Sequence, residues 1–184
     1  NVTAVKPIET GCKKSKGELI PADGKVYQKL LREKIELIVP YRYQLAVAPM
    51  VAAKKEKRTI SIKKIKKLIL EKAKNHSLVL VEGAGGLLVP ITEDYSFADL
   101  AKDLQAKCLV VVGSRLGAIN QALLTFEVLK NRKIKTLGYI LNEPYKNFNY
   151  TNESDRPALK TNRDLLKQLS KQYGLKEISY IKHQ

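Results

Sequence analysis

Apolar and polar residues along this chain follow two alternating patterns, one typical of strands and the other typical of helices. Short apolar runs, which favour buried parallel strands, occupy residues 2–6, 78–82, 108–113, 136–141 and 178–181. Apolar residues at helical spacing lie between these runs, at residues 24–37, 62–73, 97–105, 119–130 and 161–173. This alternation predicts an α/β fold with a mostly parallel sheet and helices on both faces. We expect a single α/β domain over residues 1–184, without internal repeats.

Two other stretches lack either pattern. Residues 39–49 contain two prolines and two tyrosines and are predicted to be irregular. Residues 145–157 are polar and are predicted to form a flexible loop. Gly174 directly follows the last helical interval and is expected to end that helix.

A carboxylate and a glycine-rich loop follow the apolar run at residues 78–81. The carboxylate is Glu82, and the loop consists of Gly83, Ala84, Gly85 and Gly86. Open α/β sheets bind ligands at the carboxyl ends of their strands, and glycines let the backbone approach a ligand closely. A carboxylate beside backbone N–H groups suits a metal-bound phosphate. A plain strand with a glycine turn explains the same pattern.

Three further polar residues lie near the end of the first predicted strand. Lys6 stands where strand becomes loop, a position from which a lysine binds phosphate or carboxylate, although most lysines are ordinary surface residues. Thr10 adds a hydroxyl group. Asp23 precedes the helical interval that begins at Gly24. It is either an N-cap or a second carboxylate for a hard cation such as Mg²⁺.

The segment 113–120 joins a predicted strand to a predicted helix. Helix N-termini attract anions because free N–H groups and the helix dipole point outward, so this segment is a candidate site for a carboxylate or phosphate. A plain strand-to-helix loop is the alternative. Asn142, at the end of the following strand, has the paired donor and acceptor that a nucleobase edge requires, and it suits a turn equally well.

The formal net charge of +16 is concentrated in residues 54–74, where ten Lys or Arg and two Glu supply half of it. Apolar residues between these lysines have helical spacing, which predicts an amphipathic helix with a solvated basic face. A nucleic-acid surface is the alternative, but aromatic residues do not interleave with the lysines as a stacking platform requires. We therefore interpret the charge mainly as a lysine-rich surface and predict no nucleic-acid partner.

Composition also excludes a membrane protein and a disulfide scaffold. No apolar run reaches the roughly 18 residues of a membrane span, and no signal segment opens the chain, so no membrane partner is predicted. The only cysteines, Cys12 and Cys108, are too few for a disulfide framework and lack metal-ligand spacing. A reducing cytoplasm is the simplest location.

Taken in order, the segments at these strand ends resemble the dethiobiotin synthetase family. The matching segments are VKPIETG at 5–11, VEGAGG at 81–86, VP at 89–90, FAD at 97–99, GSRLGAIN at 113–120, LLT at 123–125, Asn142 and EIS at 177–179. Their order and spacing hold over nearly the whole chain. The resemblance implies a P-loop NTPase-like fold, a homodimer, and an ATP- and Mg²⁺-dependent ligase of biotin biosynthesis.

The reaction implied by this resemblance closes a ring. The family enzyme carboxylates 7,8-diaminononanoate (7,8-diaminopelargonate) with CO₂. ATP then phosphorylates the carbamate to a carbamic-phosphoric mixed anhydride. The neighbouring amine closes the ureido ring of dethiobiotin and releases phosphate.

The resemblance also assigns roles to residues. Lys6 would steady the carbamate and the transferring phosphoryl group, and Thr10 would bind the reacting part of the substrate, so both are candidate catalytic residues. Asp23 and Glu82 would hold Mg²⁺, and Asn142 would recognise adenine. The remaining implied ATP-binding positions are Gly83, Ala84, Gly85 and Gly86. The substrate's carboxylate tail is expected, across a dimer interface, at the backbone of Gly117, Ala118, Ile119 and Asn120.

One departure from the family pattern is large, because the chain contains no segment of the form GxxxxGK[ST]. That loop holds phosphates with backbone N–H groups, and its lysine and hydroxyl serve phosphate and Mg²⁺. We expect the first strand, the P-loop and the first helix to be missing as one block, so this chain alone is expected to be poorly active. In addition, Ala22 stands where the family usually has a serine before Asp23.

Two other functions stay open. A related P-loop amidoligase would need a partner domain that hydrolyses glutamine with a nucleophilic cysteine, and Cys12 and Cys108 lack a suitable setting for that chemistry. A non-catalytic remnant would bind the substrate without hydrolysing ATP.

Overall fold

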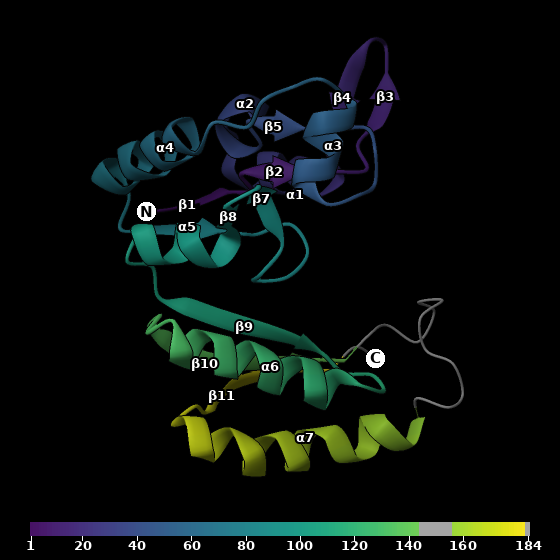
Figure 1. The fold of residues 1–184 in the computed structure, drawn as a ribbon, viewed down its shortest axis with the longest axis vertical. Helices are drawn as coiled ribbons and strands as arrows, with labels where there is room; N and C mark the ends of the chain where they lie inside the picture. Colours follow the sequence, from purple (N-terminus) through teal and green to yellow (C-terminus); the bar gives the residue numbers. More distant parts are fainter. Residues whose placement is uncertain (144–155, 183–184) are drawn as a thin grey trace. The chain divides into compact units, whose positions relative to one another are not determined.

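The computed structural model describes residues 1–143 and 156–182. Its helices and parallel strands confirm the predicted α/β class (Figure 1). The chain divides into two compact units, Asn1–Leu100 and Ala101–Gln184. The single domain over residues 1–184 stays a prediction, and most of the loop predicted at 145–157 lies outside the described residues.

Parallel pairing in the first unit joins strands that are far apart in the sequence. β1 (Val2–Val5) pairs in parallel with β6 (Leu78–Val81), and β2 (Ile8–Glu9) pairs in parallel with β5 (Tyr41–Arg42). The antiparallel pairs are β3 (Lys13–Ser15) with β4 (Glu18–Ile20), and β7 (Pro90–Thr92) with β8 (Tyr95–Ser96). The longest of these pairings, between β1 and β6, positions the first candidate site.

The single helix predicted at 24–37 is wrong, since two helices, α1 (Ala22–Leu31) and α2 (Ile35–Ile38), occupy this region. Arg32 adopts a φ of 56°, and its N–H bonds to the carbonyl of Gln28, which ends α1. The interval 39–49 is more regular than predicted, because β5 pairs with β2 within it.

The predicted basic amphipathic helix is α4 (Ile62–Asn75), and a separate helix, α3 (Pro49–Lys55), precedes it. Ser61 caps α4 by accepting a hydrogen bond from the N–H of Lys64 at 3.3 Å. The apolar face is buried and most of the lysines are exposed, as predicted. In the next helix, α5 (Phe97–Asp103), Ser96 donates its N–H to Asp99 at 2.8 Å and so marks the predicted start.

One lysine of α4 departs from the predicted solvated face. Lys72 is 7% exposed, and its Nζ donates to Thr3 Oγ1 at 3.0 Å and forms an ion pair with Glu33. A buried ammonium group is tolerated only when hydrogen bonds and an opposite charge replace its water. Lys72 therefore ties α4 to β1 and to the segment after α1.

The second unit is built around a three-stranded parallel sheet in the order β11–β10–β9 (Figure 1). Its elements are β9 (Cys108–Gly113), α6 (Ala118–Asn131), β10 (Thr136–Asn142), α7 (Arg156–Ser170), the 3-10 helix η2 (Lys171–Tyr173) and β11 (Glu177–Ile181). Its core joins Phe126 of α6 and Leu166 of α7 to Tyr139 and Leu141 of β10. Gly174, with a φ of 65°, ends η2 as predicted.

Strands β6 and β9 are less buried than their apolar sequences predict. Leu80 in β6 is 55% exposed, and Val111 in β9 is 62% exposed. Among the described residues, each of these strands pairs with one other strand of its own unit, and strand side chains alternate between faces. In β9 the next residue, Val112, joins the core against α6. The predicted full burial is therefore wrong for both strands within the described residues.

The described helices also bear on membrane insertion. Across residues 1–143 and 156–182, no helix has both the length and the apolar character that a membrane crossing requires.

Candidate active site

Strand register brings Lys6 and Glu82 together. β1 and β6 run in parallel with Val5 opposite Val81, and the N–H of Glu82 donates to the carbonyl of Val5 at 3.0 Å. Lys6 and Glu82 each follow the end of their strand and so lie side by side. Lys6 Nζ donates to Glu82 Oε1 at 2.9 Å and also to Asp23 Oδ2. We call the cluster of Lys6, Asp23 and Glu82 the charged site.

The cation of the charged site is buried, whereas its carboxylates are about half-exposed. The side chain of Lys6 is 7% exposed, against 55% for Asp23 and 46% for Glu82. Burial lowers the pKa of Lys6, but hydrogen bonds and charge interactions with Asp23 and Glu82 outweigh it and raise the pKa above the ordinary value of 10.5. Lys6 is therefore protonated at neutral pH and is a fixed positive charge rather than a base.

Asp23 lies in the first turn of α1, so its interpretation as an N-cap is wrong. The N-cap position belongs to Pro21, whose side chain makes no cap hydrogen bond. The side chain of Glu9, from outside the helix, caps the N-terminus of α1 instead. It is 5% exposed, and its carboxylate accepts from the N–H groups of Asp23 at 3.1 Å and Gly24 at 3.0 Å. A negative charge at a helix N-terminus is favoured by the helix dipole, so Glu9 fixes the start of α1 and with it Asp23.

Sequence reasoning missed both Glu9 and Tyr27. Tyr27 lies one helical turn after Asp23, and its hydroxyl donates to Glu82 Oε2. Burial and this hydrogen bond raise the pKa of Tyr27, so the hydroxyl stays protonated and donates. Both carboxylate oxygens of Glu82 therefore have a donor. The spacing of four residues after Asp23 was the signal for Tyr27, and a carboxylate within an apolar segment was the signal for Glu9.

The loop 83–86 after Glu82 has structural reasons for two of its glycines. A Cβ at Gly83 would lie 3.2 Å from the ring of Phe97. Gly85 has a φ of 81°, and a Cβ there would approach the side chain of Val89 to 3.0 Å. The carbonyl of Gly86 accepts from the N–H of Val89 at 3.0 Å. ATP binding by this loop, including Ala84, stays a prediction.

The charged site offers the oxygen ligands that Mg²⁺ prefers, in the carboxylates of Asp23 and Glu82. Mg²⁺ usually takes one or two protein carboxylates and completes its shell with water and substrate phosphates, so this pair fits the ion. No group of three or more His, Cys, Asp or Glu that could hold a metal occurs among the described residues. Thr10 lies in the loop after β2, and in the described part of the chain no hydrogen bond joins it to the charged site.

Neither cysteine has the surroundings of a nucleophile. Cys12 is 3% exposed, and burial raises its pKa; burial also raises the pKa of Cys108. A reactive cysteine needs a lowered pKa, because the thiolate is the attacking form. These surroundings give no support to glutamine hydrolysis by this chain.

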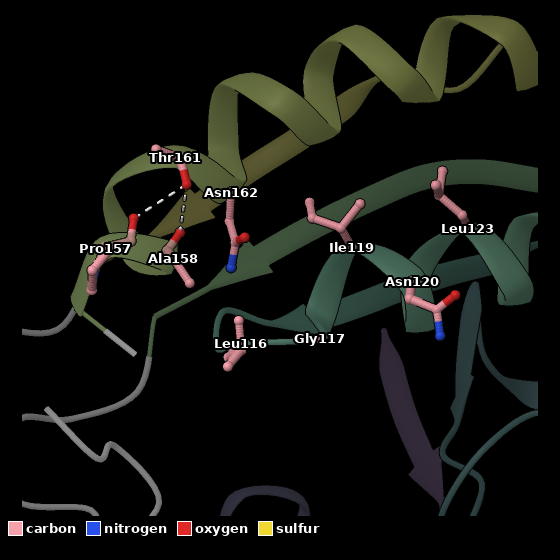
Figure 2. A pocket seen from close by; sticks show the side chains of 9 residues that line it. All are labelled: Leu116, Gly117, Ile119, Asn120, Leu123, Pro157, Ala158, Thr161 and Asn162. Carbon is pink, nitrogen blue, oxygen red and sulfur yellow. Dashed lines mark hydrogen bonds between the residues drawn. The ribbon is translucent and has the colours of Figure 1, made fainter. Parts of the chain in front are cut away.

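A pocket of about 640 Å³ lies in the second unit, between the start of α6 and the start of α7 (Figure 2). It is lined by Leu116, Gly117, Ile119, Asn120, Leu123, Pro157, Ala158, Thr161 and Asn162. We call it the apolar pocket. Three of the four residues predicted to bind a carboxylate line it, whereas Ala118 is 1% exposed and is absent from the lining. Gly117, the N-cap of α6, has a φ of 83° and makes no side-chain cap hydrogen bond.

Asn142, the predicted adenine-binding residue, is the last residue of β10 and lies opposite Gly113 of β9. Its carbonyl accepts from the N–H of Ser114 at 2.8 Å, so it also anchors the loop that leads into α6. Adenine recognition by its side chain stays a prediction. The charged site belongs to the first unit, and the apolar pocket and Asn142 belong to the second.

Comparison with known protein families shows the class of protein to which this chain belongs. A family model described as an AAA domain matches residues 1–182. With the parallel strands and the charged residues at their carboxyl ends, this match defines a P-loop NTPase-like α/β protein.

Curated relatives narrow that class. The ATP-dependent dethiobiotin synthetase BioD of Thermodesulfovibrio yellowstonii is 37% identical to this chain over 179 residues, which are 91% of this chain and 71% of that protein. The synthetase of the same name from Legionella pneumophila strain Paris is 37% identical, over 77% of this chain and 68% of its own length. That of Aquifex aeolicus is 36% identical, over 77% and 62%. The chain belongs to the ATP-dependent dethiobiotin synthetase family.

Proposed function

We propose that the protein is an ATP- and Mg²⁺-dependent dethiobiotin synthetase, which forms dethiobiotin from 7,8-diaminononanoate and CO₂. The observation that carries the proposal is the charged site, where buried Lys6 contacts Asp23 and Glu82 at the carboxyl ends of two parallel strands. The names of the matched relatives support the same reaction. Because the matches cover 62–71% of those relatives, the activity is proposed for the product of the complete gene.

The proposed reaction has three steps, each of which forms or transfers negative charge. One amine of the substrate attacks CO₂ and loses a proton, which gives a carbamate. A carbamate oxygen then attacks the terminal phosphorus of ATP. This step releases ADP and forms a carbamic-phosphoric mixed anhydride. The second amine attacks the carbon of this anhydride, loses a proton and expels phosphate, which closes the ureido ring.

Lys6 supplies a positive charge for these steps. Its pKa is raised, so it is charged throughout the neutral range. An ammonium group has three N–H donors, and Asp23 and Glu82 engage two of them. The third donor is available for an oxygen of the carbamate or of the transferring phosphoryl group. Phosphoryl transfer depends mostly on positioning and charge neutralisation, and a cation that is already oriented provides both.

Asp23 and Glu82 are the residues that would hold Mg²⁺, and the bound ion would neutralise charge on the phosphate oxygens of ATP. The chain holds both carboxylates in place. Glu82 is oriented by Lys6 and Tyr27, and Asp23 is oriented by the start of α1, which Glu9 fixes. Carboxylates held by such hydrogen bonds need little rearrangement when a ligand arrives.

The apolar pocket is proposed to bind the tail of the substrate. Its apolar lining from Leu116, Ile119 and Leu123 suits an aliphatic chain, and the start of α6 suits a carboxylate at the end of that chain. Thr10 is proposed to hydrogen-bond the reacting group, and Asn142 to recognise adenine. The resemblance to the family supports a homodimer in the cytoplasm.

A dethiobiotin assay on the purified product of the complete gene tests the proposal. With ATP, Mg²⁺, bicarbonate and the diamine, we expect dethiobiotin together with an equal amount of ADP. Omitting the diamine should abolish both. A folded protein that forms no dethiobiotin overturns the proposal. Binding of the diamine without ADP release points to a non-catalytic remnant. Residues 1–184 contain no GxxxxGK[ST] segment, so this stretch alone should show little turnover.

A further inference from the structure

Asn162 is a buried polar residue that sequence analysis did not single out. It lies on α7, is 6% exposed, and its side chain extends from the helix towards the apolar pocket (Figure 2). Its amide Nδ2 donates to the carbonyl of Arg115 at 3.0 Å and to Ser114 Oγ at 3.2 Å. Both partners belong to the loop between β9 and α6. Asn162 therefore fastens this loop to a helix that is far from it in the sequence.

The loop 114–117 has other attachments besides Asn162, among them a hydrogen bond from the Arg115 guanidinium to Gln121 Oε1 at 2.8 Å. The N–H of Ser114 donates to the carbonyl of Asn142 at 2.8 Å, which fixes its first residue. The carbonyl of Arg115 also accepts from the N–H of Ala118 at 3.1 Å, so it marks the point where the loop turns into α6. Asn162 holds that same carbonyl. Gly117, two residues after Arg115, makes no side-chain cap hydrogen bond, and its carbonyl accepts from the N–H of Gln121 at 3.2 Å.

We propose that Asn162 is a positioning residue, which holds the loop 114–117 so that the N–H groups after Ala118 in the first turn of α6 face an aliphatic carboxylate in the apolar pocket. The inference rests on the proposed function for the identity of that carboxylate. The first N–H groups of a helix have no intrahelical acceptor and bind anions only when they are aimed at them. A loop that moves carries these donors out of position.

The chemistry of the contact requires an amide. A carboxylate at position 162 has the same shape but no N–H, and it sets its oxygen against the oxygen of the Arg115 carbonyl. Because Asn162 is buried, water does not readily replace the lost hydrogen bond. Asn162→Asp is therefore expected to release the loop with little change in packing volume.

Steady-state kinetics of the complete gene product provide the first test. Asn162→Asp should raise KM for 7,8-diaminononanoate about tenfold, as expected for a lost buried hydrogen bond, and leave KM for ATP within about twofold. Asn131→Asp is the matched control, because Asn131 is exposed on α6 and its side chain donates to Glu127 on the same helix at 3.1 Å. Ser114→Ala removes one of the two contacts and should have a smaller effect. Equal rises in both KM values, or no rise in that for the diamine, overturn the positioning role.

Hydrogen exchange provides a second test that does not depend on activity. In Asn162→Asp the amides of residues 113–120 should exchange faster than in the wild type and in Asn131→Asp, and those of β10 should be unchanged. If the wild type forms no dethiobiotin, the proposed function fails while this measurement still decides whether Asn162 holds the loop. Unchanged exchange at residues 113–120, in both Asn162→Asp and Ser114→Ala, overturns the inference.

Discussion

The charged site of the first unit and the apolar pocket of the second unit carry their charge on different groups, side chains in the first and the main chain in the second. In the charged site the charges are on side chains, with buried Lys6 between two carboxylates that are about half-exposed. The described residues that line the apolar pocket include no charged side chain, and the charge there is the partial positive charge at the N-terminus of α6.

The charged site and the apolar pocket should respond differently to substitution. Replacing a charged side chain removes a whole charge and leaves its partners uncompensated. A main-chain N–H is removed only by substitution with proline; any other substitution can only move it by changing the loop that carries it. Substitutions in the first unit should therefore have the larger effects, and those in the pocket should appear mainly as changes in KM for the substrate.

Replacement of Lys6 should have the largest effect. Lys6→Met removes the cation that faces Asp23, Glu82 and the proposed phosphoryl group, so we expect kcat to fall about 10³-fold, the scale of a lost preorganised electrostatic contact. The measurement is dethiobiotin formation at saturating substrates. Lys13→Met, at an exposed lysine of β3, is the matched control and should keep wild-type activity. A Lys6→Met protein with near wild-type kcat would separate the charged site from the reaction.

The second largest effect should be on stability rather than on activity. Lys72→Met leaves Glu33 without the buried ammonium that pairs with it, and we expect unfolding in urea to cost about 3 kcal/mol less. Lys67→Met is the control on the same helix. The side chain of Lys67 is 73% exposed, so its ion pair with Glu71 should contribute under about 1 kcal/mol. Equal losses in the two variants would contradict the buried contact.

The same pair gives a pH dependence with a definite sign. Burial raises the pKa of Glu33, but hydrogen bonds from Lys72 and Thr3 and the charge of Lys72 outweigh it and hold the pKa below its ordinary value of 4.5. A carboxyl whose pKa is lowered by folding stabilises the fold above the unfolded pKa, and this contribution is lost as pH falls through the folded pKa. The stability gap between the wild type and Lys72→Met should therefore be wide at neutral pH and narrow below 4.5.

These residues also show which features of the first unit could be predicted from the sequence. Lys6 and Glu82 were predictable, because each directly follows an apolar run and parallel strands end at the same edge of a sheet. Lys72 shares the buried face of α4 with Ile65 and Ile69, at spacings of seven and three residues, so helical periodicity alone could have indicated its burial. Its partners Thr3 and Glu33 could not be predicted, because they lie on β1 and after α1.

The second unit shows the same limit. The strand at residues 108–113 and the glycine that ends η2 were predicted, since both depend on local sequence. Asn162 was not, because its partner Ser114 is 48 positions away. The burial of β9 was overestimated, as was that of β6 in the first unit, since an apolar run does not show how many neighbours a strand has.

Removal of the Tyr27 hydroxyl should have a smaller effect on the charged site than removal of Lys6. Tyr27→Phe keeps the ring but frees Glu82 Oε2, so Glu82 loses one of the two contacts that orient it. We expect affinity for Mg²⁺ to fall about tenfold with little change in KM for the diamine. Direct binding of Mn²⁺, followed by electron paramagnetic resonance, gives a readout that does not depend on turnover.

Tyr180→Phe provides the control for this variant. Tyr180 makes the same kind of contact, a hydroxyl donated to Glu143, but in the second unit, and its pKa is likewise raised, to about 12. Its loss should leave metal affinity unchanged. If the two variants weaken Mn²⁺ binding equally, Tyr27 has no special part in the charged site.

The smallest effect should come from replacement of Gly117. This variant tests whether the position of the loop 114–117 alone changes substrate affinity. Gly117→Ala adds a Cβ with open space around it, so the cost is that of a left-handed backbone at φ 83°, about 1 kcal/mol. If the loop relieves this strain by moving, KM for the diamine should rise about fivefold while KM for ATP holds, because only the N–H groups of α6 change place.

Gly174→Ala imposes the same kind of strain at φ 65°, also with open space for a Cβ, but at the end of η2. Its stability should fall about as much as that of Gly117→Ala, with no change in either KM. The two alanine variants thus carry matched backbone costs at different places in one unit. A rise in KM for the diamine in both would show that the pocket responds to general destabilisation, whereas a rise in Gly117→Ala alone ties substrate affinity to the aim of main-chain donors.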